Sequence, residues 1–322
     1  FSEEIEVDEA LETAEQKVFE ISRTGRTTNI RSTSDVLRSA MSDIEKRLAG
    51  GLAITGVPTG FPDFDKMSAG LQPGALYIVA ARPAMGKTAF ALNIGQYAAG
   101  EENVPVLIFS LEMSAEQIAQ RMLSAEAKVN LIELFESRRQ QSEQWESLKR
   151  AAQKIEKSPI FIDDSSPLNT LALRGRCRRF FAKHGEGRGL IIIDYLQLMM
   201  AARRMENRTQ EVSEISRTLK SIAREFKVPV IALSQLSRDV EKRRENNKRP
   251  MLSDLRESGS IEQDADMVLF LYREAYYAQE NDSQDATAEV IVAKNRNGPT
   301  GKVDLVFFRE FAKFENVYGA SM

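Results

Sequence analysis

Cysteine, histidine and tryptophan each occur once in this 322-residue sequence, as Cys177, His184 and Trp145. A single cysteine cannot build a disulfide framework, and one cysteine with one histidine does not make a zinc ligand set. We therefore exclude a zinc-dependent nuclease and a zinc-binding module. Trp145 lies in a segment with mostly helical character, and we expect it to serve in packing.

Long apolar runs and an excess of positive charge are also missing. No run reaches the length of a transmembrane helix, and the first nine residues are acidic rather than signal-like. The net charge is −3, so a contact with nucleic acid must be made by a local group of residues. We expect an intracellular protein without membrane contacts. Because the sequence begins with Phe1, we also expect a fragment or a processed form.

The stretch Leu76–Asn93 organises the rest of the chain. It joins an apolar strand-like run to a tight turn, the tripeptide Gly86-Lys87-Thr88 and a helix-like segment. This is the pattern of a P-loop, in which backbone N–H groups and a helix amino terminus bind phosphate. Lys87 would reach the β- and γ-phosphates and Thr88 would bind Mg²⁺. The alternative is an ordinary Gly-Lys turn.

One departure from the P-loop pattern is Ala81, which stands where the first glycine is usual. Alanine lacks the freedom to adopt positive φ, so the loop must begin in an ordinary backbone region. The predicted ATP-binding residues are Ala81, Arg82, Pro83, Ala84, Met85, Gly86, Lys87, Thr88 and Ala89.

Strand-like and helix-like segments alternate after the P-loop, which predicts an α/β core with a mostly parallel sheet flanked by helices. The last two strands are joined through Asn297-Gly298-Pro299, which indicates antiparallel strands at the carboxyl end. The predicted strands are Leu76–Ala80, Val104–Ser110, Ile160–Ile162, Leu190–Asp194, Val228–Leu233, Met267–Leu271, Ala288–Lys294 and Val303–Phe308.

The amino-terminal part precedes this core. Asp8–Ile21 has a narrow apolar stripe at helical spacing, which needs a surface to dock on, either its own domain or a neighbouring subunit. A polar linker follows, and Ser34–Leu48 predicts a second helix. We expect a helical linker over residues 1–30 and an ATPase domain over residues 31–322.

Polar residues follow three of the buried strands, where ligands bind in sheets of this kind. Asp194 would be costly at the end of an apolar strand unless it helps to hold Mg²⁺, although a helix cap or an ion pair would also satisfy it. Glu112 could deprotonate an attacking water, or simply begin a helix. Gln235 could bond a γ-phosphate and report its presence. The cofactors predicted are therefore ATP and Mg²⁺.

Two features have more ordinary explanations. The helix predicted over Leu171–Lys183 carries four arginines, which fit a solvated face better than a nucleic-acid site: Arg174, Arg176, Arg178 and Arg179. The charged stretch Arg238–Pro250 predicts a surface loop.

Six segments, in order and spacing, resemble the motor domain of DnaB-type replicative DNA helicases: ARPAMGKT, SLEMS, LIIIDYLQLM, ALSQLSR, LSDLRESGSIEQDAD and KNRNGPTG. The resemblance covers roughly Thr55 to Phe314, and Asp8–Ile21 looks like the linker helix of that family. The amino-terminal collar domain of the family is expected to be absent. The resemblance implies a RecA-like fold, a ring of six subunits and 5′ to 3′ movement on single-stranded DNA.

The resemblance also implies residue roles. Lys87 and Thr88 would bind ATP-Mg²⁺, Asp194 would hold the metal, Glu112 would be the catalytic base and Gln235 the γ-phosphate sensor. Lys294 and Arg296 would act in trans on the γ-phosphate of the neighbouring subunit. Both lie on one face of a strand, because they are two positions apart. Without the family, charges that protect an edge strand would explain them equally well.

Two channel loops of the family would bind DNA. They correspond to the segment around Arg203 and Arg204, and to the stretch that contains Arg256, Glu257 and Gly259. Arg256 can pair with a phosphate, and Gly259 allows a close backbone approach. Neither loop contains an aromatic residue, which favours sequence-independent backbone tracking with strong salt dependence.

The partners implied are single-stranded DNA, five further copies of the chain, and a helicase loader, primase and other replisome proteins. The implied location is the cytoplasm, at the nucleoid, with a plastid as the alternative. Two other functions share the same core, a RecA-type strand-exchange filament and an ATP-dependent switch or loader. The turn KNRNGPTG and the loop RESGSIEQDAD resemble the helicase more closely.

Overall fold

The computed structural model describes residues 32–49, 54–136, 142–185, 187–201, 205–243, 248–255, 259–277 and 286–317. The chain divides into two units, residues 1–53 and 54–322. In the first unit, helix α2 (Thr33–Ala49) confirms the helix predicted over Ser34–Leu48. The predicted linker helix Asp8–Ile21 lies outside the described residues.

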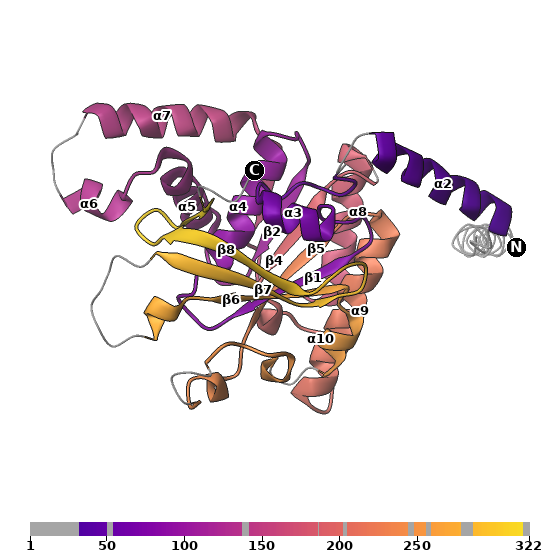
Figure 1. Ribbon diagram of the computed structural model, residues 1–322. Coiled ribbons are helices and arrows are strands. Elements are labelled where there is room, and N and C mark those ends of the chain that lie inside the picture. The colour runs from indigo at the N-terminus through magenta and orange to yellow at the C-terminus, as the bar shows by residue number, and fades with distance from the viewer. Residues whose placement is uncertain are drawn as a thin grey trace, which may run out of the picture. The chain divides into compact units, whose positions relative to one another are not determined.

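The described part of the second unit contains a nine-stranded sheet in the order β3-β2-β4-β5-β1-β6-β7-β8-β9 (Figure 1). Pairs from β3 through β6 are parallel, and β6 to β9 are antiparallel to one another in succession. The prediction of a mostly parallel sheet with antiparallel carboxyl-terminal strands is therefore confirmed. The strands are β1 Leu76–Ala81, β2 Val106–Ser110, β3 Ile160–Asp163, β4 Leu190–Asp194, β5 Val230–Gln235, β6 Met267–Tyr272, β7 Thr287–Asn295, β8 Gly301–Phe308 and β9 Lys313–Asn316.

One helix, α3 (Pro62–Ser68), precedes β1, and the other α-helices described in this unit connect the parallel strands. They are α4 Lys87–Gly100, α5 Ala115–Ala127, α6 Leu131–Glu136, α7 Ser142–Lys157, α8 Thr170–His184, α9 Arg208–Phe226 and α10 Gly259–Asp264. None of the helices that the structure describes has both the length and the apolarity that crossing a bilayer requires. The sequence pattern did not predict α3, α10 and β9, because four to seven residues give too little periodicity to recognise.

The core has two apolar layers, one on each face of the sheet. On β1, Tyr77 and Val79 pack into the layer that contains Phe90 of α4. The alternate residue Ile78 packs into the other layer, with Leu219 of α9. A strand buried on both faces reads as a continuous apolar run, which is why β1 was recognisable from sequence.

Two surface expectations have different outcomes. Trp145 on α7, which we expected to serve in packing, is 45% exposed and so lies at the surface of its unit rather than in the core. Three of the four arginines of α8 make ion pairs within the subunit: Arg174 with Glu225 at 3.3 Å, Arg176 with Asp163 at 2.8 Å, and Arg178 with Glu225 at 2.7 Å. These pairs agree with the solvated face.

Glu289 on β7 provides a test of fold stability. Its carboxylate accepts bonds from Arg249 at 2.8 and 3.0 Å, and Lys302 lies 3.3 Å away. The Arg249 bonds lower the pKa of Glu289. A carboxyl group with a lowered folded-state pKa stabilises the fold above its unfolded value of 4.5 and loses this contribution as the pH falls through the folded value.

We expect Glu289→Gln to lower the free energy of unfolding by about 1 to 2 kcal/mol at pH 7. The difference from wild type should shrink as the pH is lowered below the unfolded-state value, as measured by urea unfolding at several pH values. Glu146→Gln is the matched control, since the pair of Glu146 with Lys149 is exposed, and it should not shift the urea midpoint. A pH-independent effect of Glu289→Gln would contradict the ionic explanation.

Candidate functional site

The residues predicted to bind ATP and Mg²⁺, to activate water and to sense the γ-phosphate lie at or just after the carboxyl ends of the neighbouring strands β1, β2, β4 and β5. Ala81 at the end of β1 pairs with Gln235 at the end of β5. Asp194 at the end of β4 pairs with Ser110 at the end of β2, and Glu112 follows two residues later. Because β4, β5 and β1 are neighbours, their carboxyl ends place these groups around one region.

The phosphate loop begins in an ordinary backbone region, as predicted, because Ala81 is the last residue of β1. Positive φ falls instead at Ala84 (63°) and Gly86 (95°). A Cβ on Gly86 would lie 2.9 Å from the ring of Phe314, so glycine is needed for space as well as conformation. Helix α4 then begins at Lys87 with no side chain capping its amino end. Its free N–H groups make an anion site.

Thr88 and Asp194 form the part of the site suited to a cation. The Thr88 hydroxyl donates to Asp194 Oδ2 at 2.6 Å. Asp194 is 2% exposed, and its Oδ1 is buried without a hydrogen-bond partner among the described residues. A buried carboxylate oxygen without a partner is costly, and a divalent cation would satisfy it. Hydroxyl and carboxylate oxygens are the ligands Mg²⁺ prefers, so the residues fit a Mg²⁺–nucleotide complex.

The ammonium of Lys87 lies near the carboxylates of Asp194 and Glu112 and near the aromatic ring of Tyr195. Its Nζ is 4.7 Å from the centre of the Tyr195 ring. Burial lowers the pKa of Lys87, while the charges of Asp194 and Glu112 act in the opposite direction. The phosphates of a nucleotide would supply further counter-charge for this half-buried ammonium.

The guanidinium of Arg82 in the phosphate loop binds groups of its own subunit just after β5. The side chain is 6% exposed, donates to the Leu236 carbonyl at 2.8 Å and pairs with Glu241 at 2.9 Å. Its contacts thus hold the chain just after Gln235. Because the side chain is engaged in these contacts, the prediction that Arg82 binds the nucleotide applies to its backbone N–H.

Lys294 and Arg296 lie near the opposite ends of the strands, where β1 and β6 begin. The residue between them, Asn295, pairs with Met267 at the start of β6, and Met267 also pairs with Tyr77 near the start of β1. Within one subunit, the length of β1 therefore separates Arg296 from the phosphate loop.

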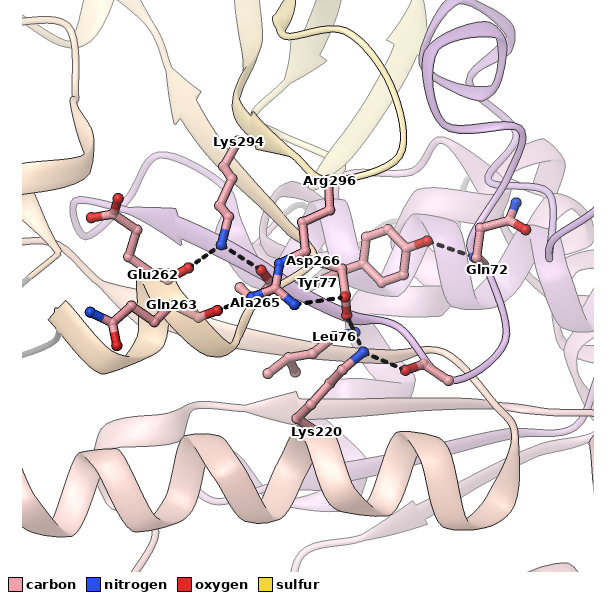
Figure 2. Close-up of polar contacts among 11 residues, drawn as sticks. Gln72, Leu76, Tyr77, Lys220, Glu262, Gln263, Ala265, Asp266, Lys294 and Arg296 are labelled. Atoms are coloured by element: carbon pink, nitrogen blue, oxygen red, sulfur yellow. Dashed lines mark hydrogen bonds and ion pairs between the residues drawn. The ribbon is translucent and has the colours of Figure 1, made fainter. Parts of the chain in front are cut away.

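Both side chains are held by the carboxyl end of α10 (Figure 2). Lys294 donates to the carbonyls of Glu262 and, at 2.8 Å, of Ala265. Arg296 donates to the Gln263 carbonyl, and its guanidinium is 3.7 Å from the Asp266 carboxylate. The predicted common direction of the two cations is thus seen, with partners in their own subunit.

Asp266 fixes this cluster to the rest of the core. Its Oδ2 accepts from the backbone N–H of Leu76 at 2.7 Å and from Lys220 at 2.6 Å (Figure 2). Its carbonyl accepts from the N–H of Arg296 at 2.9 Å. Asp266 thereby joins β1, α9 and the turn after β7. Sequence reasoning missed its role, because a carboxylate that serves a distant strand leaves no local spacing signal.

A family model described as DnaB-like helicase C terminal domain matches residues 56–316. The chain belongs to the DnaB-like helicase family. Its relatives include the replicative DNA helicase DnaB of Geobacillus stearothermophilus, 48% identical over 98% of this chain and 69% of the relative. The replicative DNA helicase DnaC of Bacillus subtilis is 49% identical over the same shares.

Two solved structures share the fold. One, described as an ATPase domain, has a TM-score of 0.83 at 41% identity, over 90% of this chain and 100% of that one. The other, a DnaB-like replicative helicase studied with its interactions with primase, has a TM-score of 0.81 at 41% identity, over 94% of this chain and 71% of that one. The RecA-like fold class is confirmed, and membership of a helicase family with ATPase domains implies nucleotide use.

Of the residues predicted to bind DNA in this DnaB-like chain, the structure describes one. Arg203, Arg204, Arg256 and Glu257 lie outside the described residues. Gly259 begins α10, and a Cβ added there would meet no atom of the described residues within 4 Å. The next residue, Ser260, bonds Ser213 of α9 at 2.8 Å. The start of α10 is thus joined to α9.

Proposed function

We propose that the chain is the ATP-driven motor of a replicative DNA helicase, a homo-hexameric ring that translocates 5′ to 3′ on single-stranded DNA and excludes the complementary strand. The position of Arg296 is the observation that supports this most directly. About 16 Å of β1 separates it from the phosphate loop of its own subunit. Arg296 therefore meets a nucleotide when a neighbouring subunit presents one, and a closed ring gives every subunit such a neighbour.

The chemistry assigned to each residue follows from its position. Lys87 and the N–H groups at the start of α4 bind the phosphates. Thr88 and Asp194 would hold Mg²⁺, which would neutralise charge on the phosphate oxygens. Glu112 is the exposed carboxylate beside Lys87, and it accepts the proton of the attacking water.

The γ-phosphate is recognised from two sides. Gln235 bonds it within the subunit and reports its presence through β5. Lys294 and Arg296 of the neighbour leave the carbonyls of α10 and stabilise the negative charge that spreads over the transferred group. Hydrolysis then returns them to α10, so that the nucleotide state and the position of α10, which begins with Gly259, change together.

DNA contacts come from Arg203 and Arg204, and from the stretch with Arg256, Glu257 and Gly259. Because these residues offer cations and backbone N–H groups rather than aromatic rings, they track phosphates without reading sequence. Affinity for single-stranded DNA should accordingly fall steeply as salt is raised.

Assembly involves the amino-terminal part of the chain and further proteins. Residues 1–30 act as a linker that docks on the neighbouring subunit, and residues 31–322 form the motor. A loader, primase and other replisome proteins bind the assembled ring at the replication fork in the cytoplasm. The similarity to the DnaB-like replicative helicase that was studied with its interactions with primase supports this part of the proposal.

Strand displacement on forked DNA tests the proposed function. We expect ATP-dependent unwinding of forks that carry a free 5′ tail and none of forks that carry only a free 3′ tail, because the ring moves with one polarity on the strand it encloses. Release of a labelled strand gives the rate, and forks without ATP are the control. Unwinding that requires the 3′ tail would contradict the polarity, and DNA-independent ATP turnover without unwinding would indicate a switch protein.

A further inference from the structure

The main chain of Gln235 is held by a second glutamine, Gln197, to which the site described above gives no role. Gln197 belongs to the short helix η1 (Leu196–Leu198), which follows Asp194. Its Oε1 accepts from the N–H of Gln235 at 3.2 Å, and its Nε2 lies 3.3 Å from the Gln235 carbonyl. The same Nε2 donates to the hydroxyl of Ser234 at 2.9 Å.

These bonds fix the orientation of the Gln197 amide. An amide has one oxygen that accepts and one nitrogen that donates. Rotating it by half a turn would place the donor against the Gln235 N–H and the acceptor against the Gln235 carbonyl. The amide therefore matches the main chain at the end of β5 and copies the pairing of a neighbouring strand. A shift of Gln235 must move Gln197 or break these bonds.

The main chain of Gln197 leads away from the nucleotide to helix α9. Its carbonyl accepts from Arg208, the first residue of α9, at 2.7 Å. Arg208 is paired with Glu211, and Glu211 also accepts from the N–H of Ala201 at 3.2 Å. The end of β5 is thus connected through Gln197 to the amino end of α9 and to the chain that precedes it.

Arg82 holds the other side of the same strand end. It binds the Leu236 carbonyl at 2.8 Å, and the N–H of Leu236 donates to Ala81 at 3.2 Å. Gln235 therefore lies between an attachment to the phosphate loop and an attachment to η1. Since the first attachment belongs to the loop that binds the nucleotide, the second is the one that can carry a displacement to α9.

We propose that Gln197 is a positioning residue for γ-phosphate recognition. It holds the end of β5 so that the Gln235 side chain meets the γ-phosphate, and it passes the resulting displacement through its own carbonyl to Arg208 and α9. This inference rests on the proposed role of Gln235 as the γ-phosphate sensor. It adds a second residue to that role and a route from the nucleotide to α9.

The ratio of affinities for adenylyl imidodiphosphate and ADP measures γ-phosphate recognition and can be determined in variants that no longer hydrolyse ATP. We expect Gln197→Leu and Gln235→Ala each to lower this ratio about tenfold, the effect of losing one bond to a charged group. The double variant should lower it no further, because both residues act on one contact. A purely structural effect of Gln197→Leu would weaken both nucleotides equally and leave the ratio unchanged.

Gln197→Glu is a second variant that tests the same contact if Gln197→Leu does not fold. It keeps the shape and the acceptor for the Gln235 N–H, but places a carboxylate oxygen against the Gln235 carbonyl, so the ratio should again fall. Gln210→Leu is the matched control, because Gln210 lies on α9 with an exposed side chain, and its ratio should equal that of wild type. Thermal unfolding of each full-length variant confirms that it is folded.

A second readout tests the route to α9. In wild type, the affinity for an oligo-dT strand should differ between the adenylyl imidodiphosphate and ADP states, and Gln197→Leu should reduce that difference at least twofold. An unchanged ratio in Gln197→Leu, with a lowered ratio in Gln235→Ala, overturns the inference and leaves the proposed function intact. An unchanged ratio in Gln235→Ala would show that Gln235 is not the γ-phosphate sensor, and it would therefore contradict this inference as well. Absence of DNA binding in wild type contradicts the proposed function, while the nucleotide ratio still decides the role of Gln197.

Discussion

Lys87→Met is expected to lower ATP turnover by about 10²- to 10³-fold, the effect of removing one preorganised charged donor from phosphoryl transfer. The Lys87 ammonium lies at the amino end of α4, and burial lowers its pKa. Methionine keeps the apolar stem and most of the volume while removing the charge. Since the buried charge opposes folding in the absence of nucleotide, the variant should unfold at the same temperature as wild type or a higher one.

Phosphate release at saturating ATP measures this effect, with thermal unfolding on the same samples. Lys128→Met is the matched control, because Lys128 is also a lysine at a helix end but is 55% exposed and paired with Glu315. Its turnover should equal that of wild type. Normal turnover in Lys87→Met would show that Lys87 does not stabilise the transferred phosphate. A large fall in the unfolding temperature would show that Lys87 stabilises the fold instead.

The central strands and the polar residues at their carboxyl ends could be predicted from the sequence for one physical reason. Strands such as β1 and β4 are buried on both faces and so read as unbroken apolar runs. A carboxylate or an amide at the end of such a run stands out, which led to Asp194 and Gln235. The rule that parallel strands bind ligands at their carboxyl ends then brought these residues together.

The contacts that position these residues could not be predicted in the same way. Gln197 bonds the main chain of Gln235, 38 residues away, and Arg82 bonds a carbonyl 154 residues away. Such bonds depend on which strands are neighbours and impose no spacing on the sequence. The contacts of Lys294 and Arg296 with α10 were missed as well, because α10 has six residues and was not recognised as a helix.

Arg296→Ala is expected to lower ATP turnover by about 10³-fold or more while ATP affinity changes little. The guanidinium is 43% exposed and rests on the carboxyl end of α10, beside Asp266. It is distant from the phosphate loop of its own subunit, so the ground-state nucleotide keeps its contacts with Lys87 and Thr88. Arg309→Ala, at an exposed arginine after β8, removes the same charge as a control and should turn over normally.

Mixing two inactive variants before assembly decides whether Arg296 acts on its own nucleotide or on that of a neighbour. The Arg296→Ala chain keeps an intact phosphate loop, and the Lys87→Met chain keeps an intact arginine. In rings formed at random from equal amounts, about a quarter of the interfaces join the two intact parts. We therefore expect ATP turnover to recover to about a quarter of the wild-type value if each interface works independently. No recovery, in mixtures shown to contain both chains in one ring, would mean that the arginine and the phosphate loop must belong to the same subunit in a ring whose interfaces work independently. The position of Arg296 at the far end of β1 argues against that arrangement.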